Sequence, residues 1–237
     1  MNANVRFSSA GAAAIAGIML LAGCASAAPT AQNTEPVASV SSEEPLTATE
    51  LVGDWGIISA DADPVSEVDE LVEFSELGVL GVVGGFTQAR LETNDPLGSD
   101  IFEPVVMRLD SPEVVAGELP EGNDGHVYIA LPGTTTAEEY AAAMPTGAMV
   151  VAYGNDLTRL SEVTPYTVLE GVPEGQGVFN VSHPAGLGIE VQQPMARSSE
   201  ATPVLVFPLQ GTVAEGVKAS SIVPGEELPE VDDPFGN

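Results

Sequence analysis

The chain has 237 residues with 35 acidic and 6 basic side chains, which gives a formal net charge of −29. This charge repels nucleic-acid phosphates and argues against a nucleic-acid binder, while a single cysteine excludes a disulfide framework and a multi-cysteine zinc site. Hydrophobic residues make up 44% of the chain, enough to build a core, so a wholly disordered chain is excluded as well.

The N-terminal segment has the pattern of a signal peptide. Arg6 precedes a continuous run of small and apolar residues over positions 10–22. A run of this length is too short for a membrane-spanning helix, which needs about 20 residues. It has the length of the hydrophobic region of an export signal. The sequence therefore predicts a signal peptide over residues 1–23.

The run ends in Leu21, Ala22 and Gly23, followed by Cys24, the only cysteine of the chain. This order resembles the lipobox of bacterial lipoproteins. The resemblance implies that Cys24 receives diacylglycerol, becomes the first residue after cleavage, and anchors the protein to the extracytoplasmic side of the cell membrane. The alternative is an ordinary secretory signal that is cleaved after residues 25–27. The absence of a twin-arginine pair favours the general export route.

Composition divides the rest of the chain into three parts. Residues 24–50 contain the lipidated cysteine and a linker rich in Ala, Ser, Thr, Pro and Glu, which predicts a disordered tether. Residues 51–223 form one β-rich domain, in which Trp55 is expected to be a packing residue that closes the barrel. Residues 224–237 are acidic and rich in proline, and we expect them to form a flexible tail.

Two helices and a third short one are predicted in this domain. Residues 66–77 have apolar side chains at helical spacing, and Ser66 with Asp69 forms a capping-box-like start. Residues 136–144 begin with Thr and two Glu, as helix N-termini do, and Pro145 ends the pattern. Residues 212–219 are expected to form the third helix.

The remaining apolar segments read as short strands separated by Gly and Pro. Arg108 is expected to point outward, and a bulge at Ser111 is expected to extend its strand to residues 114–116. His126, Tyr128 and Ala130 alternate onto one face of their strand. The predicted strands cover residues 77–86, 105–109, 126–131, 148–153, 165–169, 177–181, 187–191 and 204–207.

Eight or nine short strands with few helices predict a small closed or partly open antiparallel barrel, OB-like, in a mainly β chain. An antiparallel β-sandwich is the alternative. The order of these patterns over residues 66–190 resembles a group of exported actinobacterial proteins without assigned activity, and this resemblance implies no catalytic residues.

No catalytic pattern stands out. The sequence has no Gly-x-Ser-x-Gly or His-Glu-x-x-His motif, and Gly175-Gln176-Gly177 is better interpreted as a turn than as a phosphate loop. His126 and His183 lie at predicted strand ends, where we expect solvated side chains. We therefore predict no catalytic residues, no metal ligands, no cofactor other than the lipid on Cys24, and no enzyme activity.

Oxygen-bearing side chains cluster in several predicted loops and give calcium as the most reasonable cation. These residues are also common in turns, so the clusters do not define a site. They are Asp61 and Asp63, Asn94, Asp95 and Asp100, Asn123 and Asp124, and Asn155 and Asp156.

The anchor, the tether and the lack of catalytic motifs predict a non-enzymatic lipoprotein that binds an envelope protein, a peptide or a cell-wall component. The alternatives are a cation- or solute-binding accessory lipoprotein and, more remotely, an envelope hydrolase built on scattered carboxylates.

Overall fold

The computed structural model describes residues 63–95, 98–132, 135–144, 146–159, 165–194 and 201–231. All of them belong to one compact unit, residues 44–237. The predicted signal peptide, the lipobox with Cys24, the linker and Trp55 lie outside the described residues. Over the described part of the chain, every helix is too short or too polar to cross a membrane.

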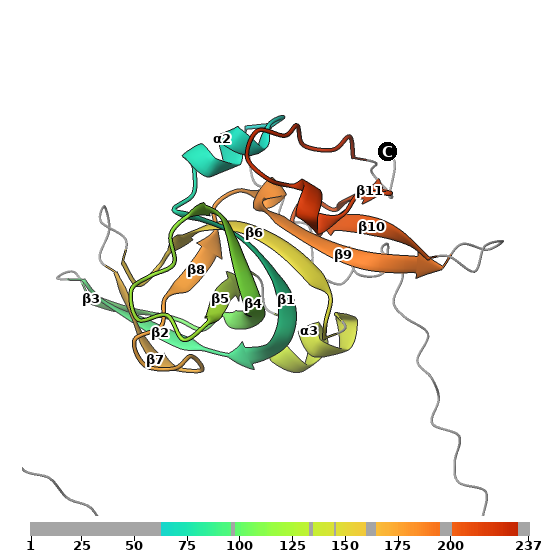
Figure 1. Ribbon diagram of the computed structural model, residues 1–237. Helices are drawn as coiled ribbons and strands as arrows, with labels where there is room; N and C mark the ends of the chain where they lie inside the picture. Colours follow the sequence, from blue (N-terminus) through green and yellow to red (C-terminus); the bar gives the residue numbers. More distant parts are fainter. Residues whose placement is uncertain are drawn as a thin grey trace, which may run out of the picture. The chain divides into compact units, whose positions relative to one another are not determined.

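Five strands form a closed barrel, as predicted (Figure 1). They are β1 (Leu77–Gln88), β4 (Val105–Gly117), β5 (His126–Leu131), β8 (Val178–Val181) and β6 (Met149–Asp156). The order is β1-β4-β5-β8-β6, and β6 pairs back with β1 to close the barrel. Every pairing is antiparallel except β5 with β8. Numbered along the chain, this is the order 1-2-3-5-4-1 of an OB-like barrel, and it excludes the sandwich.

The predicted helix at residues 136–144 is confirmed as α3 (Ala137–Ala143). It connects β5 to β6. Thr136 is its N-cap: its hydroxyl accepts a 3.3 Å hydrogen bond from the backbone N–H of Glu139, whose carboxylate accepts one of 2.8 Å from the backbone N–H of Thr136. Tyr140 and Ala143 belong to the hydrophobic core.

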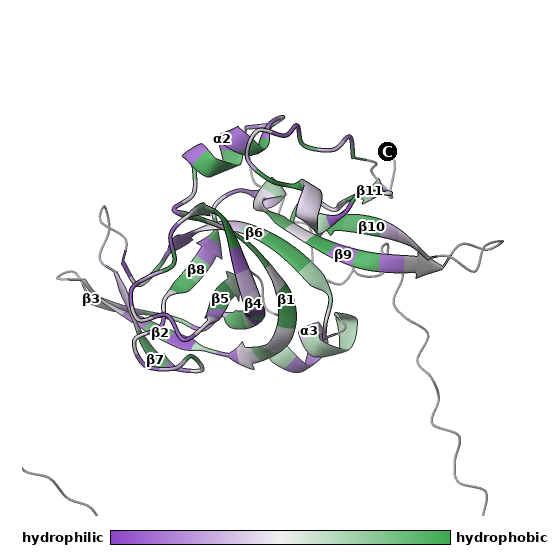
Figure 2. Ribbon diagram, viewed as in Figure 1, coloured by the Kyte–Doolittle hydropathy of each residue, from purple (hydrophilic) through white to green (hydrophobic). Residues whose placement is uncertain are grey.

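The core follows from strand alternation. Met107 on β4 and Ile129 on β5 point into the barrel, where they meet Val79, Val150 and other buried residues. Their sequence neighbours point to the outer face. In Figure 2 the hydrophobic residues are concentrated on the strands, whereas polar residues colour much of α2.

β6 extends the barrel into a further antiparallel layer. Its first half pairs with β9 (Leu187–Pro194), which continues to β10 (Ala201–Phe207) and β11 (Thr212–Glu215). A second buried cluster joins this layer to α2 (Val68–Glu73) and to the 3-10 turn η2 (Ala219–Ser221). A further 3-10 turn, η1 (Pro184–Gly186), leads from β8 into β9.

A separate three-stranded sheet was not predicted in full. Its order is β3 (Gly98–Phe102), β2 (Arg90–Asp95), β7 (Tyr166–Glu170). β2 and β3 come from the connection between β1 and β4, and β7 comes from the connection between β6 and β8. The sheet packs on outward residues of the barrel strands, among them Val106, Tyr128, Ala130 and Val178.

Three local predictions need correction. The first helix covers only Val68–Glu73, because Glu67 rather than Ser66 is the N-cap and Leu77 already begins β1. Glu70, not Asp69, accepts from the backbone N–H of Ser66 at 2.7 Å. The predicted helix at 212–219 is wrong: its first half is β11, which continues the sheet edge next to β10.

The predicted bulge at Ser111 is confirmed. The strand that begins at residue 105 continues to Gly117, with a register shift around Ser111, whose φ of 52° marks the bulge.

The chain beyond residue 223 is attached to α2. Glu226 O accepts a hydrogen bond from Val68 N at 3.0 Å, and Leu228 N donates to Ser66 O at 2.9 Å. The carboxylate of Asp69 accepts from Gly225 N at 2.9 Å. These contacts lie within the segment that the sequence suggested to be a flexible tail.

Candidate ligand-binding hollow

A hollow of about 330 Å³ opens on the outer faces of β1, β4 and β5. We call it the Arg108 hollow. Residues of the β7–β8 connection form one wall, and two glycines at the bend of β1 form another. Its lining consists of Gly84, Gly85, Phe86, Thr87, Val106, Arg108, Tyr128, Gly171 and Pro173.

Arg108 is held by a carboxylate on the same strand. Arg108 and Asp110 are both outward residues of β4, and Nε of Arg108 donates to Oδ1 of Asp110 at 2.7 Å while Nη2 donates to Oδ2 at 3.2 Å. Nη2 also donates to the carbonyl of Gly84 on β1 at 3.2 Å. The hydrogen bond from Arg108 lowers the pKa of Asp110 and the same bond raises the pKa of Arg108, so both groups are charged at neutral pH and form an ion pair.

Gly84 lies against the end of the Asp110 side chain, so a larger residue at this position would have to push the carboxylate aside. A Cβ on Gly84 would fall on the carboxylate of Asp110, and β1 bulges between Val83 and Gly85 at this point. The absence of a side chain at Gly84 thus leaves room for this carboxylate beside β1.

His126 joins the pair from the neighbouring strand. It lies directly opposite Asp110 in the β4–β5 ladder, and its Nδ1 is 2.9 Å from Oδ1 of Asp110. The ring of His126 also meets Tyr128 edge-on, with centroids 6.5 Å apart. The expectation of a simply solvated histidine is therefore wrong, although 36% of the side chain is exposed.

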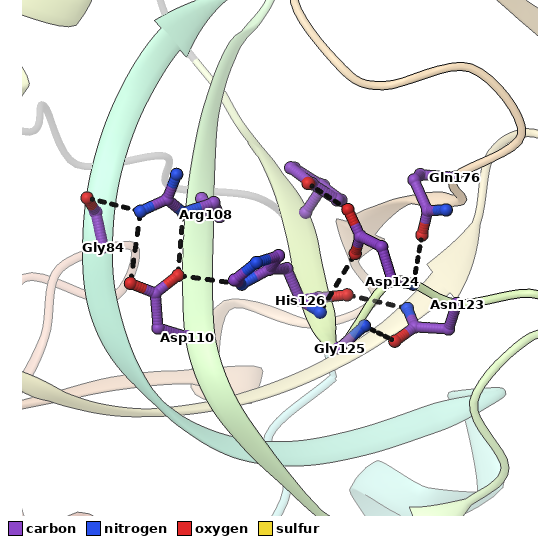
Figure 3. Close-up of polar contacts among 9 residues, drawn as sticks. Gly84, Arg108, Asp110, Asn123, Asp124, Gly125, His126 and Gln176 are labelled. Atoms are coloured by element: carbon purple, nitrogen blue, oxygen red, sulfur yellow. Dashed lines mark hydrogen bonds and ion pairs between the residues drawn. The ribbon is translucent and has the colours of Figure 1, made fainter. Parts of the chain in front are cut away.

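Tyr128 is held by the turn that precedes its strand. Its hydroxyl donates to Oδ2 of Asp124 at 3.0 Å. Oδ1 of Asp124 accepts from the backbone N–H of His126 at 3.1 Å (Figure 3). Burial, followed by the contact with Asp124, raises the pKa of Tyr128 to about 12. Because the hydroxyl donates its proton to Asp124, its oxygen keeps free lone pairs for a ligand.

The turn before β5 is hydrogen-bonded to the β7–β8 connection, which forms one wall of the hollow. Gln176, in the β7–β8 connection, accepts from Asp124 N at 3.0 Å and donates to Gly122 O at 3.2 Å. Asn123 accepts from Gly125 N at 2.8 Å and donates to His126 O at 2.7 Å. Asn123 and Asp124, considered above as calcium ligands, thus use their side chains to build the turn.

The other oxygen-rich loops are also engaged within the protein. Asn155 accepts from Glu76 N at 3.0 Å and donates to Phe74 O at 3.0 Å, while buried Asp156 accepts from Thr158 N at 2.8 Å. Among the described residues, no group of three or more His, Cys, Asp or Glu side chains is placed to hold a metal ion. Asp61 and the side chains of Asn94 and Asp95 lie outside the description.

Asp63 and Asp100 contribute backbone atoms to the contacts seen. The carbonyl of Asp63 lies 2.9 Å from Nε2 of His183, and the N–H of Asp100 donates to Thr93 at 3.2 Å. Nδ1 of His183 accepts from Ala185 N at 3.1 Å, so Nε2 is the nitrogen that donates to Asp63. His183 is thus a structural link rather than a solvated side chain.

His183 also borders a second hollow of about 330 Å³, which is mainly apolar. It lies where β5 and β8 end, beside Phe102 and Leu209. Two of its polar side chains already form hydrogen bonds within the protein. The Ser182 hydroxyl contacts the Ser75 hydroxyl at 2.5 Å, and both ring nitrogens of His183 have hydrogen-bond partners.

The convergence of Arg108, Asp110 and His126 was not predicted. The pattern that could have revealed it is the alternation of two strands joined by a turn. Arg108 and Asp110 share a face of one strand, His126 and Tyr128 share a face of the next, and an antiparallel pairing brings them opposite each other.

Comparisons with models of protein families, with curated proteins and with solved structures give no match to this chain. The lipobox residues Leu21, Ala22, Gly23 and Cys24 lie outside the described residues.

Proposed function

We propose that this protein is a lipid-anchored, extracytoplasmic binding module that holds a glycan of the cell envelope in the Arg108 hollow. The observation that carries the proposal is the hollow itself, with Arg108 and Tyr128 fixed in its wall by Asp110 and Asp124. Fixed donors and acceptors beside apolar surface are what a hydroxyl-rich ligand needs, because little order is lost when it binds.

The position of the hollow on the barrel supports the proposal. OB-like barrels bind oligonucleotides and oligosaccharides on the face of their second and third strands, between the connections that follow the first and the fourth. Here these strands are β4 and β5, which contribute Arg108 and Tyr128. A net charge of −29 disfavours the oligonucleotide.

The chemistry of Asp110 favours binding over hydrolysis. A glycosidase needs one carboxyl group with a raised pKa, which stays protonated and acts as the general acid. The hydrogen bond from Arg108 lowers the pKa of Asp110, so this group is ionised. Asp124 is occupied by Tyr128 and by the backbone of His126.

The binding test is calorimetric titration of the detergent-solubilised full chain with soluble fragments of envelope glycans. We expect saturable binding that Arg108→Gln abolishes and Tyr128→Phe weakens. Arg90→Gln is the matched control, because Arg90 is also a partly exposed arginine that pairs with an acidic residue, but it begins β2 and does not line the hollow. No binding of any fragment, or an equal loss in the control, would refute the proposal.

The location is tested separately through Cys24. Expressed in a bacterial host, the wild-type protein should lose residues 1–23, gain the mass of diacylglycerol and partition with membranes. Cys24→Ser should show neither the cleavage nor the added mass. A wild-type protein that is cleaved elsewhere and carries no lipid would reduce the proposal to a secreted binding module.

A further inference from the structure

Resting on the proposed function, we infer that Asp110 determines the charge selectivity of the Arg108 hollow, so that the site accepts uncharged glycans and rejects those that carry a carboxylate there. This inference concerns which member of the glycan class binds, and it depends on how Arg108 is already used inside the protein.

Arginine usually recognises a carboxylate through two parallel N–H donors. In Arg108 one such edge, Nε and Nη2, is taken by Asp110, and Nη2 also donates to Gly84 O. Figure 3 shows the remaining guanidinium nitrogen directed away from both partners. Within the described residues, no hydrogen bond involves Nη1, and 44% of the Arg108 side chain is exposed. This nitrogen can donate to a hydroxyl or carbonyl oxygen in the hollow.

The charges around the hollow oppose a second carboxylate. Among the described residues, Arg108 is the only basic one in the lining, and its charge is balanced by Asp110 at 2.7 Å. Asp124, next to Tyr128, adds a negative charge that no basic side chain contacts among the described residues. A ligand carboxylate at Nη1 would meet an arginine whose charge Asp110 already balances, and the negative charges of Asp110 and Asp124 would oppose it.

Residues from three strands surround the carboxylate of Asp110. We therefore interpret it as part of the site and not as an isolated surface ion pair. β4 supplies Asp110 and Arg108, β5 places His126 at 2.9 Å, and β1 provides Gly84, where a side chain would displace the carboxylate.

The test compares two ligands that differ at one group, which is a carboxylate in one and an uncharged amide in the other. The disaccharide of N-acetylglucosamine and N-acetylmuramic acid is used with its lactyl carboxylate either free or converted to the methylamide. Wild-type protein should bind the methylamide at least about tenfold more tightly. Asp110→Asn keeps the shape of the side chain but removes its charge, and should lower this ratio at least about tenfold, mainly through tighter binding of the carboxylate.

Asp100→Asn is the control, because it makes the same change in net charge at an exposed residue of β3 outside the hollow. It should leave the ratio unchanged. If Asp110→Asn does not fold, Gly84→Ala displaces the same carboxylate and should lower the ratio too. Equal binding of both ligands by the wild-type protein, or an unchanged ratio in Asp110→Asn, would overturn the inference while leaving the proposed function in place. No binding of either ligand would refute both.

Discussion

Removing one buried hydroxyl should measure how strongly the C-terminal segment is held to the barrel. Tyr153 on β6 is fully buried, and its hydroxyl donates to the carbonyl of Ile222 at 3.0 Å. In Tyr153→Phe the ring remains but the Ile222 carbonyl loses its partner. Because this hydrogen bond is buried, the expected loss in the free energy of unfolding at pH 7 is about 1–3 kcal/mol.

The same residue predicts a pH dependence. Burial raises the pKa of Tyr153 to about 12, whereas an unfolded tyrosine has a pKa of about 10. The folded pKa lies above the unfolded one, so the contribution of Tyr153 is complete below pH 10 and is lost as the pH rises from about 10 to about 12. Between these two pKa values the contribution of Tyr153 to the free energy of unfolding falls by about 1.4 kcal/mol per pH unit. A phenylalanine at this position does not titrate and shows no such fall. The difference in stability between wild type and Tyr153→Phe should therefore shrink by about 1 kcal/mol by pH 11.

Urea unfolding followed by circular dichroism measures the difference in the free energy of unfolding between wild type and Tyr153→Phe at pH 7 and at pH 11. Tyr166→Phe is the control, because within the described residues the Tyr166 hydroxyl makes no hydrogen bond and its ring packs partly exposed against Phe102. Raised pKa values of other tyrosines cancel in the comparison. A stability difference that is the same at both pH values would refute the assignment of a buried, protonated Tyr153.

Three further changes test other parts of the fold. Gly154→Ala should lower the free energy of unfolding in urea by at least about 1–3 kcal/mol, because the new Cβ would overlap the carbonyl oxygen of Asn180 in the β6–β8 ladder. A variant that unfolds at the same urea concentration as the wild-type protein would contradict that pairing. Thr136→Ala should lower the free energy of unfolding by about 1 kcal/mol through loss of the α3 cap, and Thr136→Ser should restore it. Truncation after residue 223 should lower the melting temperature by several degrees, since it removes hydrogen bonds to α2, whereas truncation after residue 231 should not.

The barrel could be predicted from the sequence because its signals are local. In β5 the alternation of His126, Tyr128 and Ala130 against Val127 and Ile129 fixes which residues face the core. Thr136, which begins α3, is an equally local signal. Glycine-rich segments indicated where the barrel strands bend, so the fold class followed from patterns within about ten residues.

The small sheet and the start of α2 depended on contacts that no local pattern records. β2 contains Arg90, Glu92 and Thr93, which give no clear alternation, and it becomes a strand because β3 and β7 supply its hydrogen bonds. Glu67 caps α2 instead of Ser66 partly because a distant segment, at Glu226, binds the backbone of Val68. Tertiary pairing overrode weak local preference in both places.

The candidate site was missed for the same reason. Asp110 and His126 are 16 positions apart and meet only through the β4–β5 register, and Gly84 is placed under Asp110 by a bulge in a third strand. Each residue has an ordinary explanation when it is considered alone. Only their combination distinguishes a built pair from scattered surface charges.

The small sheet also limits the size of the ligand. Leu91 of β2 and Val168 of β7 pack on the outer face of β4 and β5 at Val106 and Ala130, so that part of the barrel is covered by the protein itself. Arg108 lies beyond the covered part, which leaves about 330 Å³ of hollow instead of a groove along the whole face. Since a long glycan would need that groove, the structure favours recognition of a chain end or of a few sugar units. Longer fragments should then bind no more tightly than short ones in the same titration.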